Sequence, residues 1–286
     1  MNFKFLILNQ NQAPIMISKI QNSKFKIQNS SHIPRKRFGQ NFLVDTQVVA
    51  DIIRAIHPTQ ADRVVEIGPG LGALTRPLLQ RLEHLQVVEI DRDIVERLRR
   101  EFPEERLTVY SADALKFDFS ALGKNLRVVG NLPYNISTPI LFHLSEFATN
   151  ITDMHFMLQK EVVARMVASH STPDYGRLSV MLQCRFEMEQ LFIVPPQAFQ
   201  PAPKVESAII RMSPLRQPPI AASQEKLFAG IVSAAFSQRR KTLRNTLGGH
   251  LKPEDFTALK IDPGLRAENL SVVQFVTITN HLAGST

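Results

Sequence analysis

The chain has 286 residues with 44% hydrophobic and 21% charged side chains, which is typical of a globular protein with a sizeable core. No apolar run approaches the roughly 18 residues that span a bilayer, and the single cysteine excludes an internal disulfide and a cysteine-based zinc site. The net charge of +8 predicts a polyanionic partner, nucleic acid before a membrane surface. We expect Cys184, in an apolar segment, to be a buried thiol in a cytoplasmic protein.

Residues 1–33 differ in composition from the rest of the chain. They are rich in Asn, Gln, Ser and Lys, and Lys19–Ser23 is nearly repeated in Lys26–Ser30. We interpret them as a disordered, low-complexity tail without a catalytic role, or as translation begun upstream of the true start, with Met16 or a later residue as the candidate. A transit peptide is a weaker interpretation, because no arginine precedes Arg35.

From residue 62 onward the sequence alternates strand and helix patterns. Buried strands are expected at 63–67, 85–90, 107–110, 126–130 and 154–158, with helices at 74–82, 94–101, 137–147 (capped by Ser137) and 161–168. Two apolar segments, 191–194 and 208–212, flank a proline-rich loop and predict an antiparallel pair at the sheet edge. The expected fold is a Rossmann-like α/β domain over residues 34–216, with a doubly wound sheet and an antiparallel edge strand.

Beyond a linker at 216–219 the pattern is helical only. Gly248-Gly249 stops a helix that carries an apolar stripe, formed by Phe228, Ile231, Val232, Ala235, Phe236, Leu243 and Leu247. We expect residues 217–286 to form a small all-α domain.

A glycine turn follows the first strand of the α/β pattern. Glu66-Ile-Gly-Pro-Gly-Leu-Gly72 lies between that strand and a helix, where glycines let the backbone approach a ligand. As a dinucleotide fingerprint it is imperfect, because its spacing is Gly-x-Gly-x-Gly and Pro69 lacks an amide donor. An NAD-dependent oxidoreductase is therefore the alternative to an S-adenosylmethionine enzyme. Glu89, which closes the next strand, can accept ribose hydroxyl groups in either case.

Two further polar residues follow strands. Asp113 comes after the third strand and can accept a hydrogen bond from an adenine amine, although an isolated Asp there is usually a turn former. Asn131 closes the fourth strand. Because ligands of open α/β sheets bind at the carboxyl ends of the strands, we expect the glycine turn, Glu89, Asp113 and Asn131 to share one site.

Asn131-Leu132-Pro133-Tyr134 suits chemistry on the exocyclic amine of adenine. That amine is a poor nucleophile because its lone pair is delocalised into the ring. The Asn131 amide oxygen and the carbonyl of Leu132 or Pro133 can accept its two hydrogens, while Tyr134 stacks on the base, worth roughly 1–3 kcal/mol. The alternative is a proline-containing turn after a buried strand.

Other residues are candidates for supporting roles. Phe199 either closes the other face of the base or is an ordinary core phenylalanine, and His143 and His155 are interpreted as helix-face and strand residues. We expect no metal, no covalent nucleophile and no dedicated base. Two basic clusters are either RNA contacts or merely solvated faces: Arg35-Lys36-Arg37, and Arg239, Arg240, Lys241 and Arg244.

With these motifs the chain closely resembles the rRNA adenine N6,N6-dimethyltransferase family, of the bacterial small-subunit type, from about residue 34 to 282. The resemblance is carried by the glycine turn and by 38–43, 88–92, 130–137, 199–207, 236–245 and 266–270. It implies contacts to S-adenosylmethionine from Asn41, Leu43, Gly68, Gly70, Glu89, Asp113 and Asn131.

The resemblance also implies a substrate. That substrate is a pair of adjacent adenines in a loop near the 3′ end of small-subunit rRNA, each dimethylated in an immature 30S-type subunit by a monomeric enzyme. Single-stranded adenines suit such a site better than duplex DNA. Two alternatives stay open: a relative that methylates large-subunit rRNA, and a non-catalytic nucleic-acid-binding or assembly factor on the same fold.

Overall fold

The computed structural model describes residues 41–284. The interpretations of residues 1–33 and of Arg35, Lys36 and Arg37 lie outside these residues. The described residues, 41–284, belong to one compact unit by their contacts, and the division at 216/217 stays a prediction. No helix within residues 41–284 is long and apolar enough to cross a membrane.

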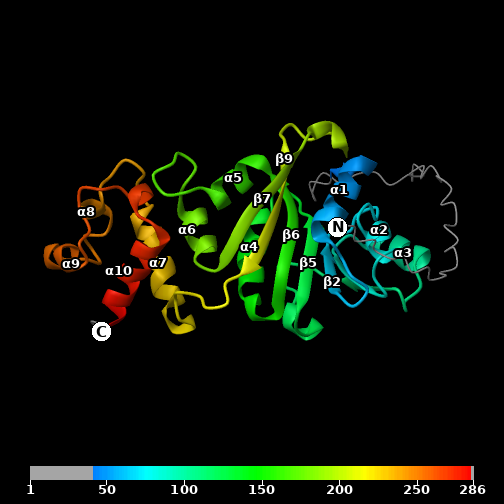
Figure 1. Cartoon of the computed structure of the whole chain (residues 1–286), viewed down its shortest axis with the longest axis horizontal. Coiled ribbons are helices and arrows are strands. Elements are labelled where there is room, and N and C mark those ends of the chain that lie inside the picture. The colour runs from blue at the N-terminus through cyan, green and yellow to red at the C-terminus, as the bar shows by residue number, and fades with distance from the viewer. Residues whose placement is uncertain (1–40, 285–286) are drawn as a thin grey trace, which may run out of the picture. The chain divides into compact units, whose positions relative to one another are not determined.

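A seven-stranded sheet lies at the centre of this unit, in the order β4-β3-β2-β5-β6-β9-β7 (Figure 1). Its strands are β2 (Arg63–Ile67), β3 (Leu85–Glu89), β4 (Leu107–Ser111), β5 (Leu126–Asn131), β6 (Ile151–Gln159), β7 (Phe186–Val194) and β9 (Ser207–Pro214). The pairs from β4 to β6 are parallel, whereas β9 is antiparallel to both β6 and β7. The predicted antiparallel pair at the edge is therefore confirmed, with β7 outermost.

Helices cover both faces of the sheet because the strands are apolar on both sides. They are α1 (Thr46–Ile56), α2 (Thr75–Leu79), α3 (Arg92–Glu101), α4 (Ser137–Ser145), α5 (Lys160–Val167) and α6 (Arg177–Gln183). Val65 of β2 packs in a core with α4, α5 and α6. Its neighbour Val64 points the other way, into a core with α1, α2 and α3.

One helix start differs from the sequence prediction. Ser137 was expected to cap α4, but the cap position is Ile136 and Ser137 is the first helical residue. The Ser137 hydroxyl donates instead to the carbonyl of Tyr134, at 3.0 Å. The predicted cap is wrong because this hydroxyl turns back toward the loop rather than to the amides of the helix.

A two-stranded antiparallel sheet joins distant parts of the chain. β1 (Phe42–Leu43) pairs with β8 (Phe199–Gln200), so that Leu43 lies opposite Phe199. Short 3-10 helices complete the connections: η2 (Phe119–Leu122), η3 (Ala148–Asn150), η4 (Pro196–Ala198), η5 (Ala222–Gln224) and η6 (Ala267–Asn269). The small sheet brings the segment just after residue 40 beside the proline-rich loop.

The C-terminal residues form a group of helices beside α6 (Figure 1). They are α7 (Glu225–Ala235), α8 (Leu243–Thr246), α9 (Pro253–Ala258) and α10 (Val272–Gly284). Their core also contains Tyr175, Val180 and Cys184. Cys184 is buried, as predicted.

The predicted continuous apolar helix is wrong. The stripe residues do pack in one core, but α7 ends at Ala235 and α8 begins at Leu243. The amides of Leu243 and Arg244 donate to the carbonyls of Leu265 and Pro263, so a distant loop provides the partners that a preceding helical turn would have supplied.

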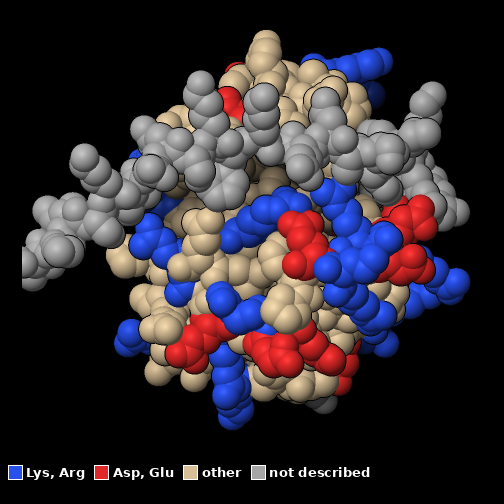
Figure 2. Space-filling model, turned by 90° about the vertical axis from the view of Figure 1, so that its right-hand side faces the viewer, with Lys and Arg blue, Asp and Glu red and all other residues tan. Residues whose placement is uncertain are grey.

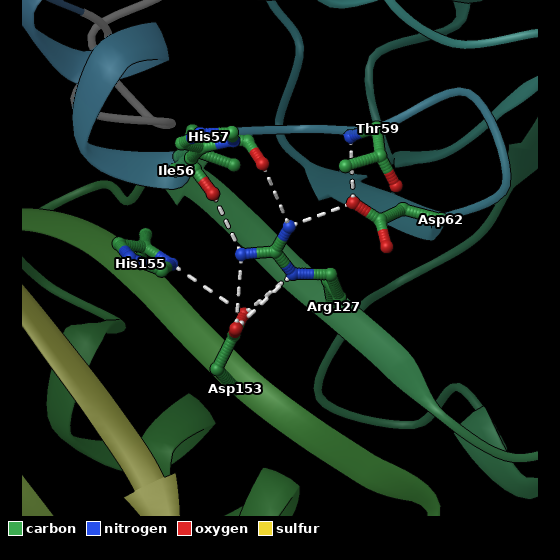
Figure 3. A network of polar contacts seen from close by, with 7 residues as sticks. All are labelled: Ile56, His57, Thr59, Asp62, Arg127, Asp153 and His155. Atoms are coloured by element: carbon green, nitrogen blue, oxygen red, sulfur yellow. Dashed lines mark hydrogen bonds and ion pairs between the residues drawn. The ribbon is translucent and has the colours of Figure 1, made fainter.

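Arg127, on β5, ties the amino-terminal edge of the sheet together (Figure 3). Its guanidinium contacts Asp62 at 2.8 Å, Asp153 at 2.9 Å and the carbonyls of Ile56 and His57. Burial opposes the ionisation of Asp62 and Asp153, but hydrogen bonds and the charge of Arg127 outweigh it and lower the pKa of both carboxyls. This network lies at the edge of the sheet opposite the carboxyl ends of the parallel strands.

Candidate active site

The parallel strands place four of the predicted groups at one edge. β4, β3, β2 and β5 are successive neighbours, so their carboxyl ends lie side by side. Asp113 follows β4, Glu89 ends β3, Gly68 follows β2 and Asn131 ends β5. The structure therefore brings together the groups that the sequence analysis assigned to one site.

The glycine turn packs closely against β1. Gly70 has a φ of 54°, in the left-handed region that favours glycine. A Cβ at this position would lie 3.2 Å from the ring of Phe42, tighter than ordinary contact. The turn and the segment Asn41–Leu43 are thus held against each other, which explains how residues far apart in sequence can line one ligand site.

Glu89 is preset for hydrogen bonding at the strand end. Its side chain is buried, and one carboxylate oxygen accepts from the amides of Ile90 and Asp91, both at 2.9 Å. Burial raises the pKa of Glu89, against the lowering effect of these amides. A fixed carboxylate next to a glycine turn is suited to a ribose, so these residues fit the cofactor that the resemblance implies.

Glu66 is a titratable group that the sequence analysis left without a role. It is only 1% exposed, and it accepts a hydrogen bond from the Thr75 hydroxyl at 2.7 Å. Burial, and to a smaller extent the charge of Glu89, raises the pKa of Glu66 to about 7. The available sequence signal was an acidic residue two positions before the first glycine of the turn.

The Asn131 side chain is oriented by the backbone of Asn41. Its amide nitrogen donates to the Asn41 carbonyl at 3.1 Å, which directs the amide oxygen away from Asn41. The preceding Gly130 allows β5 to approach β2, because a Cβ there would lie 2.5 Å from the Ile67 carbonyl oxygen. The acceptor atom of Asn131 is therefore set by two neighbouring backbone segments.

The residues after Asn131 form a tethered turn. The amide of buried Leu132 donates to Met157, at 3.2 Å, and the Pro133 carbonyl accepts from the Ile136 amide, at 3.1 Å. The hydroxyl of half-buried Tyr134 lies 2.7 Å from that of Ser207. Burial raises the pKa of Tyr134, so the hydroxyl stays protonated at neutral pH.

The side chains of Asp113, Leu43 and Phe199 differ in whether they can reach a ligand. One carboxylate oxygen of Asp113 accepts from the Leu115 amide at 3.0 Å, as in a turn former, and leaves the second oxygen for a ligand. Leu43 and Phe199 are buried opposite each other in the core between the sheet and α1. The burial of Phe199 favours the core interpretation, and its contact with the target base stays a prediction.

The second basic cluster follows the first part of the apolar stripe but does not lie on one continuous helix. Arg239, Arg240 and Lys241 occupy the connection between α7 and α8, and Arg244 is in α8; all four are exposed. Arg239 donates to the Pro173 carbonyl at 3.2 Å. Over α2 and α3, by contrast, basic and acidic side chains are mixed (Figure 2), as in the pair Arg76–Glu101 at 2.6 Å.

Comparison with solved structures defines the class of fold. The 23S rRNA methyltransferase ErmE superposes with a TM-score of 0.67 and 26% identity, over 85% of this chain and 100% of that one. A dimethyladenosine transferase from Plasmodium falciparum gives a TM-score of 0.72 at 24% identity, over 85% and 98%. The α/β domain thus has the fold of the S-adenosylmethionine-dependent methyltransferases.

Sequence comparison narrows this class to a family. The model of the ribosomal RNA adenine dimethylases matches residues 31–284. The small-subunit rRNA methyltransferase A of Nitrosospira multiformis is 73% identical over 87% of this chain and 96% of its own length, and that of Thiobacillus denitrificans is 66% identical over 88% and 99%. The chain belongs to the ribosomal RNA adenine dimethylase family and is an S-adenosylmethionine-dependent rRNA adenine dimethyltransferase.

Proposed function

We propose that this enzyme dimethylates the N6 amines of two adjacent adenines in a loop near the 3′ end of small-subunit rRNA. The substrate is an immature 30S-type subunit, and the enzyme acts in the cytoplasm as a monomer. The identities of 73% and 66% to small-subunit methyltransferases, against 26% to a 23S rRNA methyltransferase, support the small subunit over the large one.

The single observation that carries the chemical part of this proposal is the orientation of Asn131. Since its amide nitrogen is engaged by the Asn41 carbonyl, the amide oxygen is the atom presented as an acceptor. The Pro133 carbonyl already accepts from the Ile136 amide, which favours the Leu132 carbonyl as the second acceptor. Two acceptors for one amine suit a primary aromatic amine whose hydrogens must be held.

These acceptors act on the nucleophile. Hydrogen bonds to both amine hydrogens favour a pyramidal nitrogen, whose lone pair is then available for attack. When bound, S-adenosylmethionine supplies an electrophilic methyl group on a sulfonium that is already an activated leaving group. The protein contributes mainly by positioning, which can supply about 7–11 kcal/mol of the barrier.

Tyr134 serves as the stacking platform for the target base. After methyl transfer, the proton on the adenine N6 nitrogen leaves to water, because the methylated adeninium amine is strongly acidic. The two histidines considered above have other partners. The His143 ring contacts the Phe117 carbonyl at 2.8 Å, and His155 is buried 3.5 Å from Asp153. Neither is assigned a role in proton transfer.

The remaining candidate residues divide between the cofactor and the RNA. Gly68, Gly70, Glu89 and Asp113 hold the cofactor together with Asn41, Leu43 and Asn131. The exposed cluster of Arg239, Arg240, Lys241 and Arg244 contacts phosphates, as do Arg35, Lys36 and Arg37. This surface gives affinity for a polyanion, whereas the Asn131 turn selects adenine.

The alternative of a non-catalytic factor is addressed by one pair of variants. Tyr134→Ala removes the stacking platform, so methyl transfer to rRNA should fall by roughly 5- to 160-fold, the equivalent of roughly 1–3 kcal/mol. Glu89→Ala is the matched control at the cofactor end and should weaken S-adenosylmethionine binding by ten-fold or more, because hydrogen bonds to charged groups contribute roughly 1.5–3 kcal/mol.

The two measurements are methyl incorporation into rRNA and calorimetric binding of S-adenosylmethionine without RNA. We expect Tyr134→Ala to bind the cofactor normally. Transfer at the wild-type rate by Tyr134→Ala would contradict the assignment of the turn, and absence of transfer by the wild-type protein would favour the assembly-factor alternative. Mapping methylated adenines in rRNA from cells lacking the gene identifies the target positions.

A further inference from the structure

Two buried serines contact Tyr134 from opposite ends. Ser207 is fully buried and Ser137 is 1% exposed. Ser207 lies within 2.7 Å of the Tyr134 hydroxyl, and Ser137 donates to the Tyr134 carbonyl at 3.0 Å. The turn that presents the aromatic ring is therefore attached to the fold through both its side chain and its backbone.

Ser207 is well placed to hold a side chain still. It is the first residue of β9 and lies in register with Gln159, at the end of β6, and with Val194, at the end of β7. A strand residue paired on both sides has little freedom to move. Because β9 runs antiparallel to β6, its first residue meets the carboxyl edge of the parallel strands, where the Asn131 turn lies.

Ser137 holds the other end of the same residue. As the first residue of α4 it is anchored by the helix, and its hydroxyl satisfies the Tyr134 carbonyl rather than a helix amide. Stacking on adenine needs only the aromatic ring, which phenylalanine supplies equally well. The hydroxyl of Tyr134 therefore has a different use, and its partner is Ser207.

We propose that Ser207 and Ser137 are positioning residues that pre-organise Tyr134 for the target adenine, an inference that rests on the proposed function. Ser207 fixes the direction of the ring, and Ser137 fixes the backbone from which the ring projects. A platform held in its bound orientation has less conformational freedom to lose when the base arrives. Both serines act through Tyr134 and contact neither the cofactor nor the reacting amine.

The test is a double-mutant cycle measured by single-turnover methyl transfer to rRNA at saturating S-adenosylmethionine. Ser207→Ala and Tyr134→Phe remove the same hydrogen bond from its two sides. Each should slow transfer by roughly 2- to 12-fold, the factor that corresponds to one net hydrogen bond. The double variant should be no slower than either single variant, because the bond can be lost only once.

Ser137→Ala provides an internal contrast. Its partner is the backbone carbonyl, which phenylalanine retains, so its effect should persist undiminished in the Tyr134→Phe background. Ser179→Ala is the matched control, since this buried serine bonds to the Arg165 carbonyl and not to Tyr134. We expect Ser179→Ala to transfer methyl groups at the wild-type rate and cofactor affinity to be unchanged in all four single variants.

Several outcomes would overturn the positioning role. If Ser207→Ala slowed methyl transfer in the Tyr134→Phe background by the same factor as in the wild type, Ser207 would act independently of the Tyr134 hydroxyl. Methyl transfer at the wild-type rate by Tyr134→Phe would also overturn the positioning role, and this result does not depend on whether Ser207→Ala folds. Failure of the proposed function looks different, because then Tyr134→Ala itself would transfer normally.

Discussion

Replacing Glu66 by glutamine tests how much an ionised carboxylate at this buried position lowers the free energy of unfolding. Glutamine resembles the protonated acid, since it keeps an acceptor for the Thr75 hydroxyl and removes the charge. The folded pKa of about 7 lies above the ordinary value of 4.5. The native state therefore holds this proton more tightly than the unfolded chain does.

The sign of the pH dependence follows from that order. Below pH 4.5 both states are protonated, and the contribution of Glu66 to stability is fully present. It is lost as the pH rises from 4.5 to about 7, because the unfolded chain has already released the proton. At about 1.4 kcal/mol per pH unit, the shift corresponds to a loss of about 3 kcal/mol.

We expect urea unfolding to show Glu66→Gln more stable than the wild type at pH 8, by up to about 3 kcal/mol, and close to it at pH 4.5. The quantity to follow is the difference between the two proteins at each pH, which cancels the other titrating groups. Glu105→Gln, at an exposed position, controls for the loss of one negative charge. A constant difference between Glu66→Gln and wild type across this range would refute the reasoning.

Three further outcomes are expected. Converting Arg239, Lys241 and Arg244 to Gln should weaken rRNA binding, with the salt slope of log affinity reduced by up to roughly 0.7–0.9 per lost phosphate contact; an unaltered slope would remove the RNA assignment of this cluster. Arg127→Ala should lower the free energy of unfolding at pH 7 by roughly 3–5 kcal/mol, because it leaves two part-buried carboxylates without their partner; the loss should shrink in acid, where protonation removes those charges. Burial raises the pKa of Cys184 to about 11, so a thiol reagent at pH 8 should label it only when the protein is unfolded; rapid labelling of the native protein would contradict its burial.

Local pattern was sufficient to predict the α/β sheet and the meeting of the candidate groups at one of its edges. A strand that is apolar on both faces must be covered by helices, and the carboxyl ends of parallel strands meet at one edge. Glu89, Asp113 and Asn131 could therefore be assigned to one site from their places after successive strands. The antiparallel pair of β7 and β9 was likewise predicted from two apolar segments around a proline-rich loop.

Periodicity failed where long-range contacts decide the backbone. The apolar spacing continues from Phe236 to Leu243 as in one helix, yet α7 ends at Ala235 and the next helix, α8, begins only at Leu243. The amide of Leu243 is satisfied by the Leu265 carbonyl, 22 residues further along. A hydrophobic stripe records which side chains are buried together, and it does not record which carbonyl each amide will meet.

The sequence by itself determined which segments form the strands of the seven-stranded sheet and which polar groups lie at their ends, because both depend on neighbours along the chain. Tertiary structure alone decided how those groups are held. The contact between Tyr134 and Ser207 joins residues 73 positions apart, and the pKa of Glu66 depends on burial by several elements at once. Orientation and desolvation arise from packing in three dimensions, where the separation of residues along the chain no longer matters.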